Sequence, residues 1–221
     1  MTKETNSCRS LGRPLVNNPL HIAPTLGCFL RRIAINYLRY GYYRWVLRVI
    51  PRDRDLTQID TKLIQIYGVT LCRTTRMRQR RRGLAVVQYV RWGHTFILLA
   101  TEGSHQQFDR LRSFDTRDTP IVISAYTLGV RSSRVMVEVR HRAWQAVTNR
   151  IHRQALYDRS IVEASIATLP FYRFPGVIRQ MRDLVKAVNL RRRVAGLPLV
   201  ETRIESRWKS FIGKKRPMVM N

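Results

Sequence analysis

Residues 70–102 read TLCRTTRMRQRRRGLAVVQYVRWGHTFILLATE, and two apolar runs within them decide the fold. The runs, Leu84–Arg91 and His94–Thr101, each have about the length of a strand and are rich in β-branched and aromatic residues. Trp92 and Gly93 separate them, and a glycine there suits a tight reversal of the chain. The pattern therefore predicts a β-hairpin.

A block of arginines lies directly before the hairpin. It comprises Arg73, Arg76, Arg78, Arg80, Arg81 and Arg82. Six guanidinium groups within ten residues cannot be desolvated without partners, and almost no carboxylates lie nearby in the sequence. We therefore expect the block to face water or a polyanion, mounted at the edge of a folded sheet.

The composition points to the same kind of partner. The 221-residue chain is 44% apolar, which is enough for a core, but carries 41 basic against 14 acidic side chains and a formal charge of +27. Most of the basic residues are arginine, whose planar fork binds phosphate bidentately and stacks on bases. Nucleic acid is therefore the expected partner.

The cysteines and the apolar runs indicate where such a protein works. Cys8, Cys28 and Cys72 are too few and too scattered for a disulfide framework or a metal knuckle, which favours a reducing compartment. The sequence contains no apolar run of about 18 residues, so neither a membrane span nor a secretory signal is predicted. We expect a cytoplasmic protein. The acid-free stretch between Glu4 and Asp53, which is typical of transit peptides, leaves an organellar matrix as the alternative.

The segments before the arginine block predict a short series of elements. Residues 1–40 are expected to form a basic arm and then a short amphipathic helix over 25–40. Tyr42–Ile50 alternates as a strand with one core face and one basic, aromatic face. A helix is expected over 56–67, ended by Gly68.

After the hairpin, Ser104 is expected to cap a helix over His105–Phe114. Strands at Ile121–Tyr126 and Val135–Val139 and a helix over 142–156 follow. The first six elements then run strand, helix, strand, strand, helix, strand. This order resembles the ferredoxin-like α+β arrangement, an antiparallel sheet backed by two helices, here with an added strand.

The sheet domain is thus expected to span residues 41–158. Residues 159–202 are expected to form a helical C-terminal region, with helices over Ile161–Leu169 and Val177–Val194. A basic tail over 203–221 ends the chain.

Further cations join the arginine block as candidate contacts with nucleic acid. On the sheet, Tyr42, Arg44 and Arg48 could form a surface that stacks on bases and contacts phosphate. The alternative is that helices of the C-terminal half cover this face. The remaining candidates are Arg91, Arg191, Arg192, Arg193, Lys214 and Lys215. Cations in the last turn of a helix also favour its dipole, so part of the 191–193 cluster has a structural explanation.

An enzymatic reading rests on fewer residues. His94, Glu102 and His105, with Asp109 nearby, are weak candidates for acid–base catalysis or metal binding. Glu102 and His105 are expected at the junction between a strand and a helix, where residues of this kind also serve as helix caps. A nuclease-type pattern at Asp118 and 138–140 is equally unspecific. No phosphate-binding glycine loop, hydrolase elbow or zincin motif occurs, so no cofactor or metal is expected.

The sequence therefore favours a non-catalytic nucleic-acid-binding protein, with RNA preferred to DNA, acting as a subunit of a ribonucleoprotein, mobile-element or defence complex. The RNA preference rests on the arginine-rich segments and aromatic faces and on the lack of a helix-turn-helix or zinc finger. One alternative is a nucleic-acid-processing enzyme, either a metal-independent ribonuclease or a nuclease or transposase accessory. Another is a ribosomal structural protein.

Overall fold

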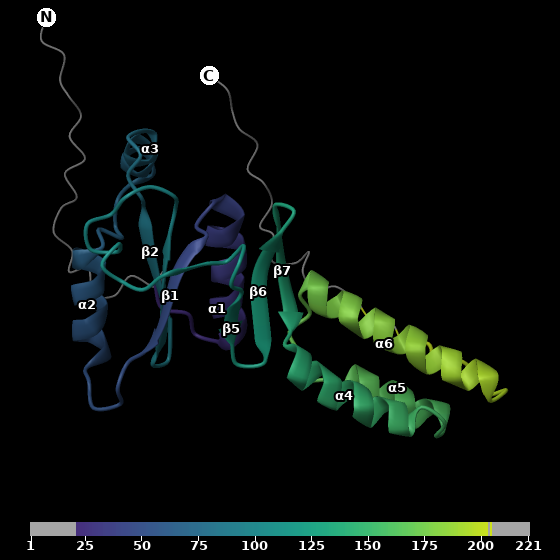
Figure 1. Ribbon diagram of the computed structural model, residues 1–221. Coiled ribbons are helices and arrows are strands. Elements are labelled where there is room, and N and C mark those ends of the chain that lie inside the picture. The colour runs from purple at the N-terminus through teal and green to yellow at the C-terminus, as the bar shows by residue number, and fades with distance from the viewer. Residues whose placement is uncertain (1–20, 203, 205–221) are drawn as a thin grey trace, which may run out of the picture. The chain divides into compact units, whose positions relative to one another are not determined.

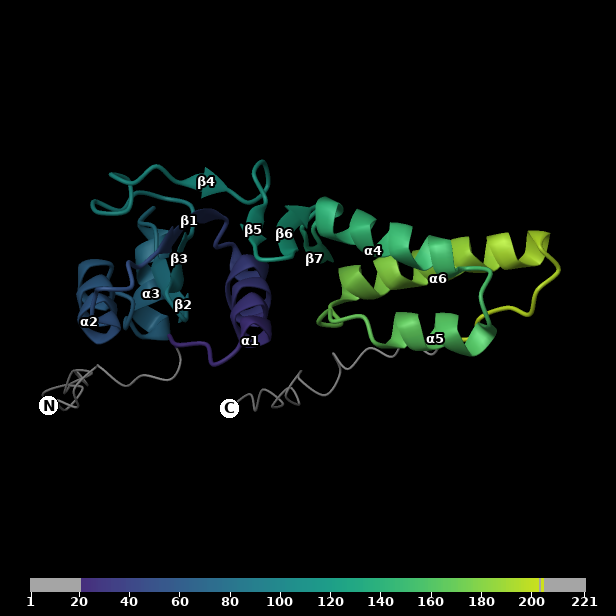
Figure 2. The ribbon, with the colours of Figure 1, turned by 90° about the horizontal axis from the view of Figure 1, so that it is seen from below.

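The computed structural model describes residues 21–202 and 204, which form a mixed α+β structure with antiparallel sheets in two compact units (Figures 1 and 2). The first unit holds residues 21–33 and 44–113 of the described part, and the second holds residues 34–43, 114–202 and 204. The boundary at Ser113 lies within the segment 41–158 that the sequence pattern assigns to one sheet domain. The predicted arm up to residue 20 and most of the predicted tail, including Lys214 and Lys215, lie outside the described residues.

The sheet of the first unit confirms the predicted hairpin. Strands β2 (Val87–Trp92) and β3 (Thr95–Ala100) pair antiparallel, and β1 (Arg44–Val49) pairs antiparallel with the other edge of β3. Trp92 and Thr95 are partners, so the reversal occupies two residues, and Gly93 has a φ of +54°. A left-handed residue at the first central position suits such a turn, and glycine adopts it without strain.

Helices cover both faces of this sheet. On one face, Ile64 of α2 (Leu56–Ile66) packs in a cluster with Val46, Tyr89 and Leu98. On the other face, Phe29 of α1 (Leu26–Arg31) lies against the ring of Trp92. Because both faces are covered, nearly every side chain of β2 is buried.

The predicted helices before β2 are confirmed. Helix α1 begins after Thr25, whose side chain caps it, and continues as a π-helical segment (Arg32–Tyr37) and a 3₁₀ turn (Leu38–Tyr40). Asp55 caps α2 by accepting a hydrogen bond from the Thr57 amide at 2.8 Å.

The helix predicted over 105–114 is wrong. The structure has turns there, because Phe108 is drawn into the core and Asp109 turns its carboxylate back to the amide of His105 at 2.8 Å. Such a local side-chain bond competes with helical pairing. A segment of about ten residues has little intrinsic helical stability to resist it.

The second unit contains an antiparallel meander of β5 (Ile121–Ile123), β6 (Tyr126–Arg131) and β7 (Arg134–Val139), and a two-residue strand β4 (Phe114–Asp115) precedes it. The strand predicted over Ile121–Tyr126 is therefore interrupted, since the chain reverses at Ser124, which has a φ of 52°. The strand predicted over Val135–Val139 is confirmed. The ferredoxin-like topology is not confirmed, because β3 leads into turns and β5 pairs with β6 in a separate sheet.

Three helices complete the second unit, as predicted. They are α4 (His141–Gln154), α5 (Arg159–Ala167) and α6 (Pro175–Val194). Helix α6 lies directly on β7, where a Cβ on Gly176 would fall 2.5 Å from the Val137 carbonyl oxygen. The side chain of Gln180 fixes this contact by bonding both the amide and the carbonyl of Val139, at 2.8 and 3.0 Å. Among the described helices, none has the length and apolar content needed to cross a bilayer.

Candidate nucleic-acid interface

The arginine block forms a helix, α3 (Arg73–Arg81), directly before β2. Arginine, methionine and glutamine are good helix formers, and cations in the last turn favour the helix dipole. The helix ends at Arg82, and Gly83, with a φ of +73°, turns the chain toward the sheet. The sequence predicts the position of the block but not its helical conformation.

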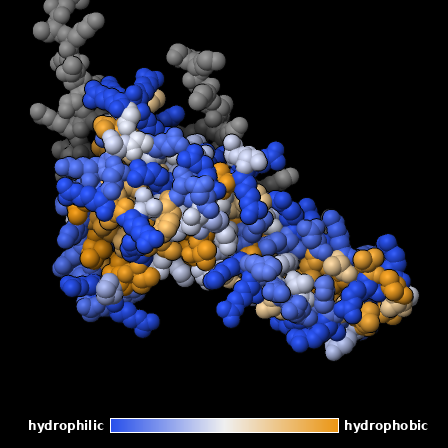
Figure 3. All heavy atoms as spheres, in the orientation of Figure 1, coloured by the Kyte–Doolittle hydropathy of each residue, from blue (hydrophilic) through white to orange (hydrophobic). Residues whose placement is uncertain are grey.

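The side chains of α3 confirm the prediction that the block is not core. None of its residues is buried, and five arginines are exposed: Arg73, Arg78, Arg80, Arg81 and the following Arg82. Met77 is 47% exposed between them. In Figure 1, α3 lies beyond the end of β2, and the surface over it in Figure 3 is mostly hydrophilic.

The charge of this surface is of one sign along a long stretch of chain. The sequence has no acidic residue between Asp60 and Glu102, a stretch that includes α3 and the hairpin. Clustered cations of this density attract a polyanion and gain affinity by releasing its condensed counterions.

Backbone contacts fix the base of α3 to the sheet. Leu84 and Ser104 form an isolated bridge, and the Ser104 amide donates to the Gly83 carbonyl at 3.1 Å. Gly103, with a φ of +112°, lies so close to Gly83 that an added Cβ would fall 2.4 Å from its carbonyl oxygen. The base of the helix is therefore held by contacts between backbone atoms.

A free thiol stands at the start of α3. Cys72 is exposed, and its sulfur lies 3.2 Å from the hydroxyl of Thr75. Hydrogen bonds from the Thr75 side chain and then its backbone lower the pKa of the Cys72 thiol below its ordinary value.

The predicted surface on β1 is largely occupied. Tyr42 is only 4% exposed, and its ring stands edge-on to Tyr37 at 5.6 Å between centroids. Arg44 lies over the ring of Phe108 and donates to Asp109 at 2.7 Å. Arg48, at the other end of the strand, remains exposed. Besides Tyr37, the residues covering this face belong to α2 and to the turn at Phe108, and not to the C-terminal helices that the alternative prediction placed there.

Arg91, predicted to contact nucleic acid, is not part of the candidate interface. It is 7% exposed, and its guanidinium donates to both carboxylate oxygens of Asp60, each at 2.7 Å. The hydroxyl of Tyr89 donates to the same carboxylate. Burial, together with the hydrogen bond and charge of Asp60, raises the pKa of Tyr89 far above its usual range.

Arg192 is likewise not part of the candidate interface, because it is only 2% exposed. Its guanidinium donates to three backbone carbonyls, those of Ala155, Tyr157 and Pro198, at 2.6–2.8 Å. It thereby ties the α4–α5 connection to the segment that follows α6. Its neighbours Arg191 and Arg193 are exposed, and their role in binding stays a prediction.

The candidate acid–base residues do not form one site. His94 directly precedes β3 and His105 comes after it, and the six residues of this strand span roughly 20 Å. The His94 ring lies 3.2 Å from the Ile50 carbonyl oxygen, and the His105 ring accepts from the Phe108 amide. The His105 amide and then Arg44 lower the pKa of Asp109. Within the described residues, no three His, Cys, Asp or Glu side chains gather as metal ligands would.

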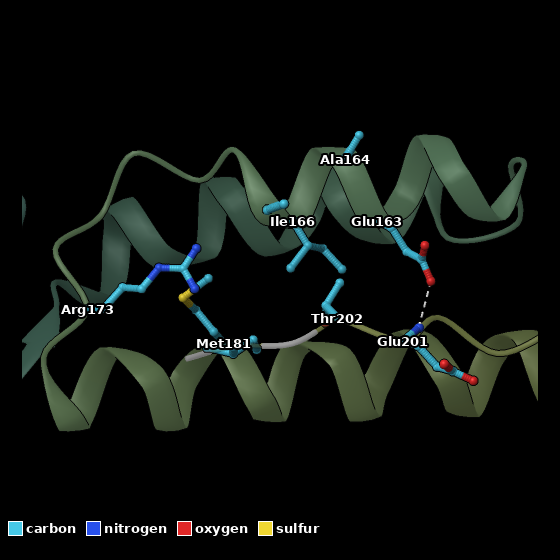
Figure 4. Close-up of a pocket in the computed structure, with 9 residues that line it drawn as sticks. Glu163, Ala164, Ile166, Arg173, Met181, Glu201 and Thr202 are labelled. Carbon is cyan, nitrogen blue, oxygen red and sulfur yellow. Dashed lines mark hydrogen bonds between the residues drawn. The ribbon is translucent and has the colours of Figure 1, made fainter. Parts of the chain in front are cut away.

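A cavity of about 260 Å³ lies among the helices of the second unit (Figure 4). Its lining is Glu163, Ala164, Ile166, Ala167, Arg173, Met181, Glu201, Thr202 and Ile204. Glu163 is already engaged, since it accepts from Arg159 at 2.8 Å and from the Glu201 amide at 2.7 Å. The bond from Arg159 lies within α5, and the bond from the Glu201 amide connects α5 to the segment after α6, so the role of Glu163 is structural.

Comparisons of the chain with protein-family models, with curated proteins and with solved structures found no match.

Proposed function

We propose that the protein is a non-catalytic nucleic-acid-binding protein that contacts its ligand through α3. The observation that supports this proposal is a nine-residue helix with no buried side chain, followed directly by Arg82, in a stretch without acidic residues from Asp60 to Glu102. Such a helix places no fully buried side chain in the core, so its charge is explained best by a partner of opposite sign.

RNA is the preferred ligand in this proposal. Arginine both forks to phosphate and stacks on bases, which suits the mixed backbone and base contacts of RNA recognition. The excess of +27 on the whole chain fits a subunit of a larger ribonucleoprotein, mobile-element or defence assembly in the cytoplasm or an organellar matrix, where neighbouring polyanion offsets the repulsion.

The experiment compares two sets of four charge removals in the full-length protein. The first set changes Arg78, Arg80, Arg81 and Arg82 to glutamine. The second changes Arg142, Arg150, Arg153 and Arg182, exposed arginines of the second unit, in the same way. Both variants keep the same net charge, so any difference reports position.

The α3 set is expected to cost at least about 2 kcal/mol of RNA-binding free energy, and the control set clearly less, because phosphate contacts are local. The melting temperature of both should stay near that of the parent protein, since exposed charges contribute little to folding. Equal losses from the two sets would show that only net charge counts, and an unchanged affinity in the α3 set would overturn the proposal.

A further inference from the structure

The arginines of α3 do not form a single stripe. At about 100° per residue, Arg80 and Arg73 lie on one flank of the helix, and Arg78 and the C-cap residue Arg82 lie about 140–200° away on the other. Between these flanks, the centre of the exposed arc holds Met77, Arg81 and Thr74.

The burial of individual side chains supports this division. The side opposite the arc holds Thr75, Arg76 and Gln79, and these three are the partly buried residues of α3, whereas every residue on the arc is exposed. The exposed arc therefore presents cations at both edges and a mixed strip, with an apolar methionine, in its middle.

A helix lying on one row of phosphates needs cations on one side only, within a stripe of about 100°. An arc of about 200° with cations at both edges matches phosphates on two sides, as in a groove between two backbones. The helix with its side chains is about 10–12 Å across and about 13.5 Å long. The B-form major groove, about 12 Å wide, admits such a helix, whereas the regular A-form RNA major groove is deep and too narrow for side chains to read.

We propose that α3 enters the major groove of a double helix that is wide enough to hold it, with its two arginine flanks on opposite phosphate rows and Met77, Thr74 and Arg81 toward the base edges. This rests on the proposed nucleic-acid-binding function. The groove is supplied either by RNA widened at a bulge or by B-form DNA. Arginine recognises guanine edges, and the apolar Met77 side chain contacts a base surface that phosphate does not offer.

The test measures binding of the full-length protein to four probes of equal charge: an RNA duplex with a bulge, the same duplex without it, B-form DNA and single-stranded RNA. At least one wide-groove probe, the bulged RNA or the DNA, is expected to bind tenfold or more tightly than both the regular RNA duplex and the single strand. Whichever of the two leads identifies the source of the groove.

Paired variants test the two flanks. Arg73→Gln with Arg80→Gln, and Arg78→Gln with Arg82→Gln, should each weaken wide-groove binding and lower the slope of log affinity against log salt by roughly 2. Arg76→Gln, on the inner side, is the control and should change the slope little. Met77→Ala should reduce the preference for the wide groove with the salt slope unchanged.

Loss of binding from one flank only, or equal affinity for all four probes, would overturn groove entry and leave the proposed function standing. No binding to any probe would overturn the proposed function itself.

Discussion

The guanidinium of Arg91 and the carboxylate of Asp60 face each other as a buried, two-point ion pair, with both N–O distances at 2.7 Å. The pair joins α2 to β2, and Tyr89 donates its hydroxyl to the same carboxylate. The guanidinium and the phenol hydroxyl both donate hydrogen bonds to this carboxylate, so the ion pair belongs to the core of the first unit and not to its binding surface.

Removing the carboxylate of this pair should destabilise the fold. Asp60→Ala leaves a guanidinium and a phenol buried without their partner, and we expect a loss of about 3–5 kcal/mol in the free energy of unfolding, measured by urea denaturation. Asp183→Ala, which removes the exposed partner of Lys186, is the control and should cost less than about 1 kcal/mol. Similar losses from both substitutions would show that the buried Asp60–Arg91 pair stabilises the fold no more than the exposed Asp183–Lys186 pair does.

Arg192 should behave as a core residue within a basic cluster. Arg192→Ala removes the donor from three backbone carbonyls, and we expect it to lower the free energy of unfolding by at least about 2 kcal/mol. Arg193→Ala, one residue along and exposed, should stay within about 0.5 kcal/mol of the parent protein. Calorimetry or denaturant titration distinguishes them, and equal effects would contradict the assignment.

Cys72 should react as an activated thiol. Because hydrogen bonds from Thr75 lower its pKa, more of the thiol is ionised at a given pH than in an unstructured peptide. The pH midpoint for iodoacetamide alkylation of the Cys72 peptide, followed by mass spectrometry, should therefore lie below that of free cysteine. Thr75→Ala should move it upward. No difference between parent and variant would refute this role of Thr75.

Binding should depend steeply on salt. If the arginines neutralise six to ten phosphates, affinity falls by roughly 10³–10⁵ between 50 and 200 mM salt, because each released counterion gains less entropy when the bulk salt concentration is higher. Fluorescence anisotropy over that range measures it. A flat profile is incompatible with the electrostatic account.

Labelled RNA and DNA should remain intact when incubated with the purified protein, with and without divalent metal ions. The expectation follows from His94 and His105, which lie beyond opposite ends of β3 and each use a ring nitrogen in a backbone contact. Gel electrophoresis of the products checks it. Cleavage that His94→Ala or His105→Ala abolishes would establish an enzyme.

The local sequence pattern was sufficient to predict the hairpin, α2 and the helices of the second unit, because their periodicity and capping residues can be recognised within short stretches of sequence. The pattern failed where distant residues decide the outcome. The segment after Ser104 is shaped by the burial of Phe108 and the bonds of Asp109, and neither is visible in local spacing.

The candidate interface shows the same division. A dense cationic run can be identified as exposed from charge alone, and α3 confirms it. The exposure of a single arginine cannot be predicted in this way, because its burial depends on partners far away in the chain: Asp60 for Arg91, and the carbonyls of Ala155 and Tyr157 for Arg192. The one sequence signal for the first pair was Asp60 itself, a lone carboxylate among the apolar positions of α2.

The attachment of α3 through Gly83, with no side chain of the helix in the core, also bears on how this protein can change over generations. The exposed positions of α3 can be substituted with little penalty to folding, since their side chains lie outside the core. Ligand preference can therefore drift or be re-engineered by exchanging this one helix, while the hairpin and its ion pair keep the scaffold constant.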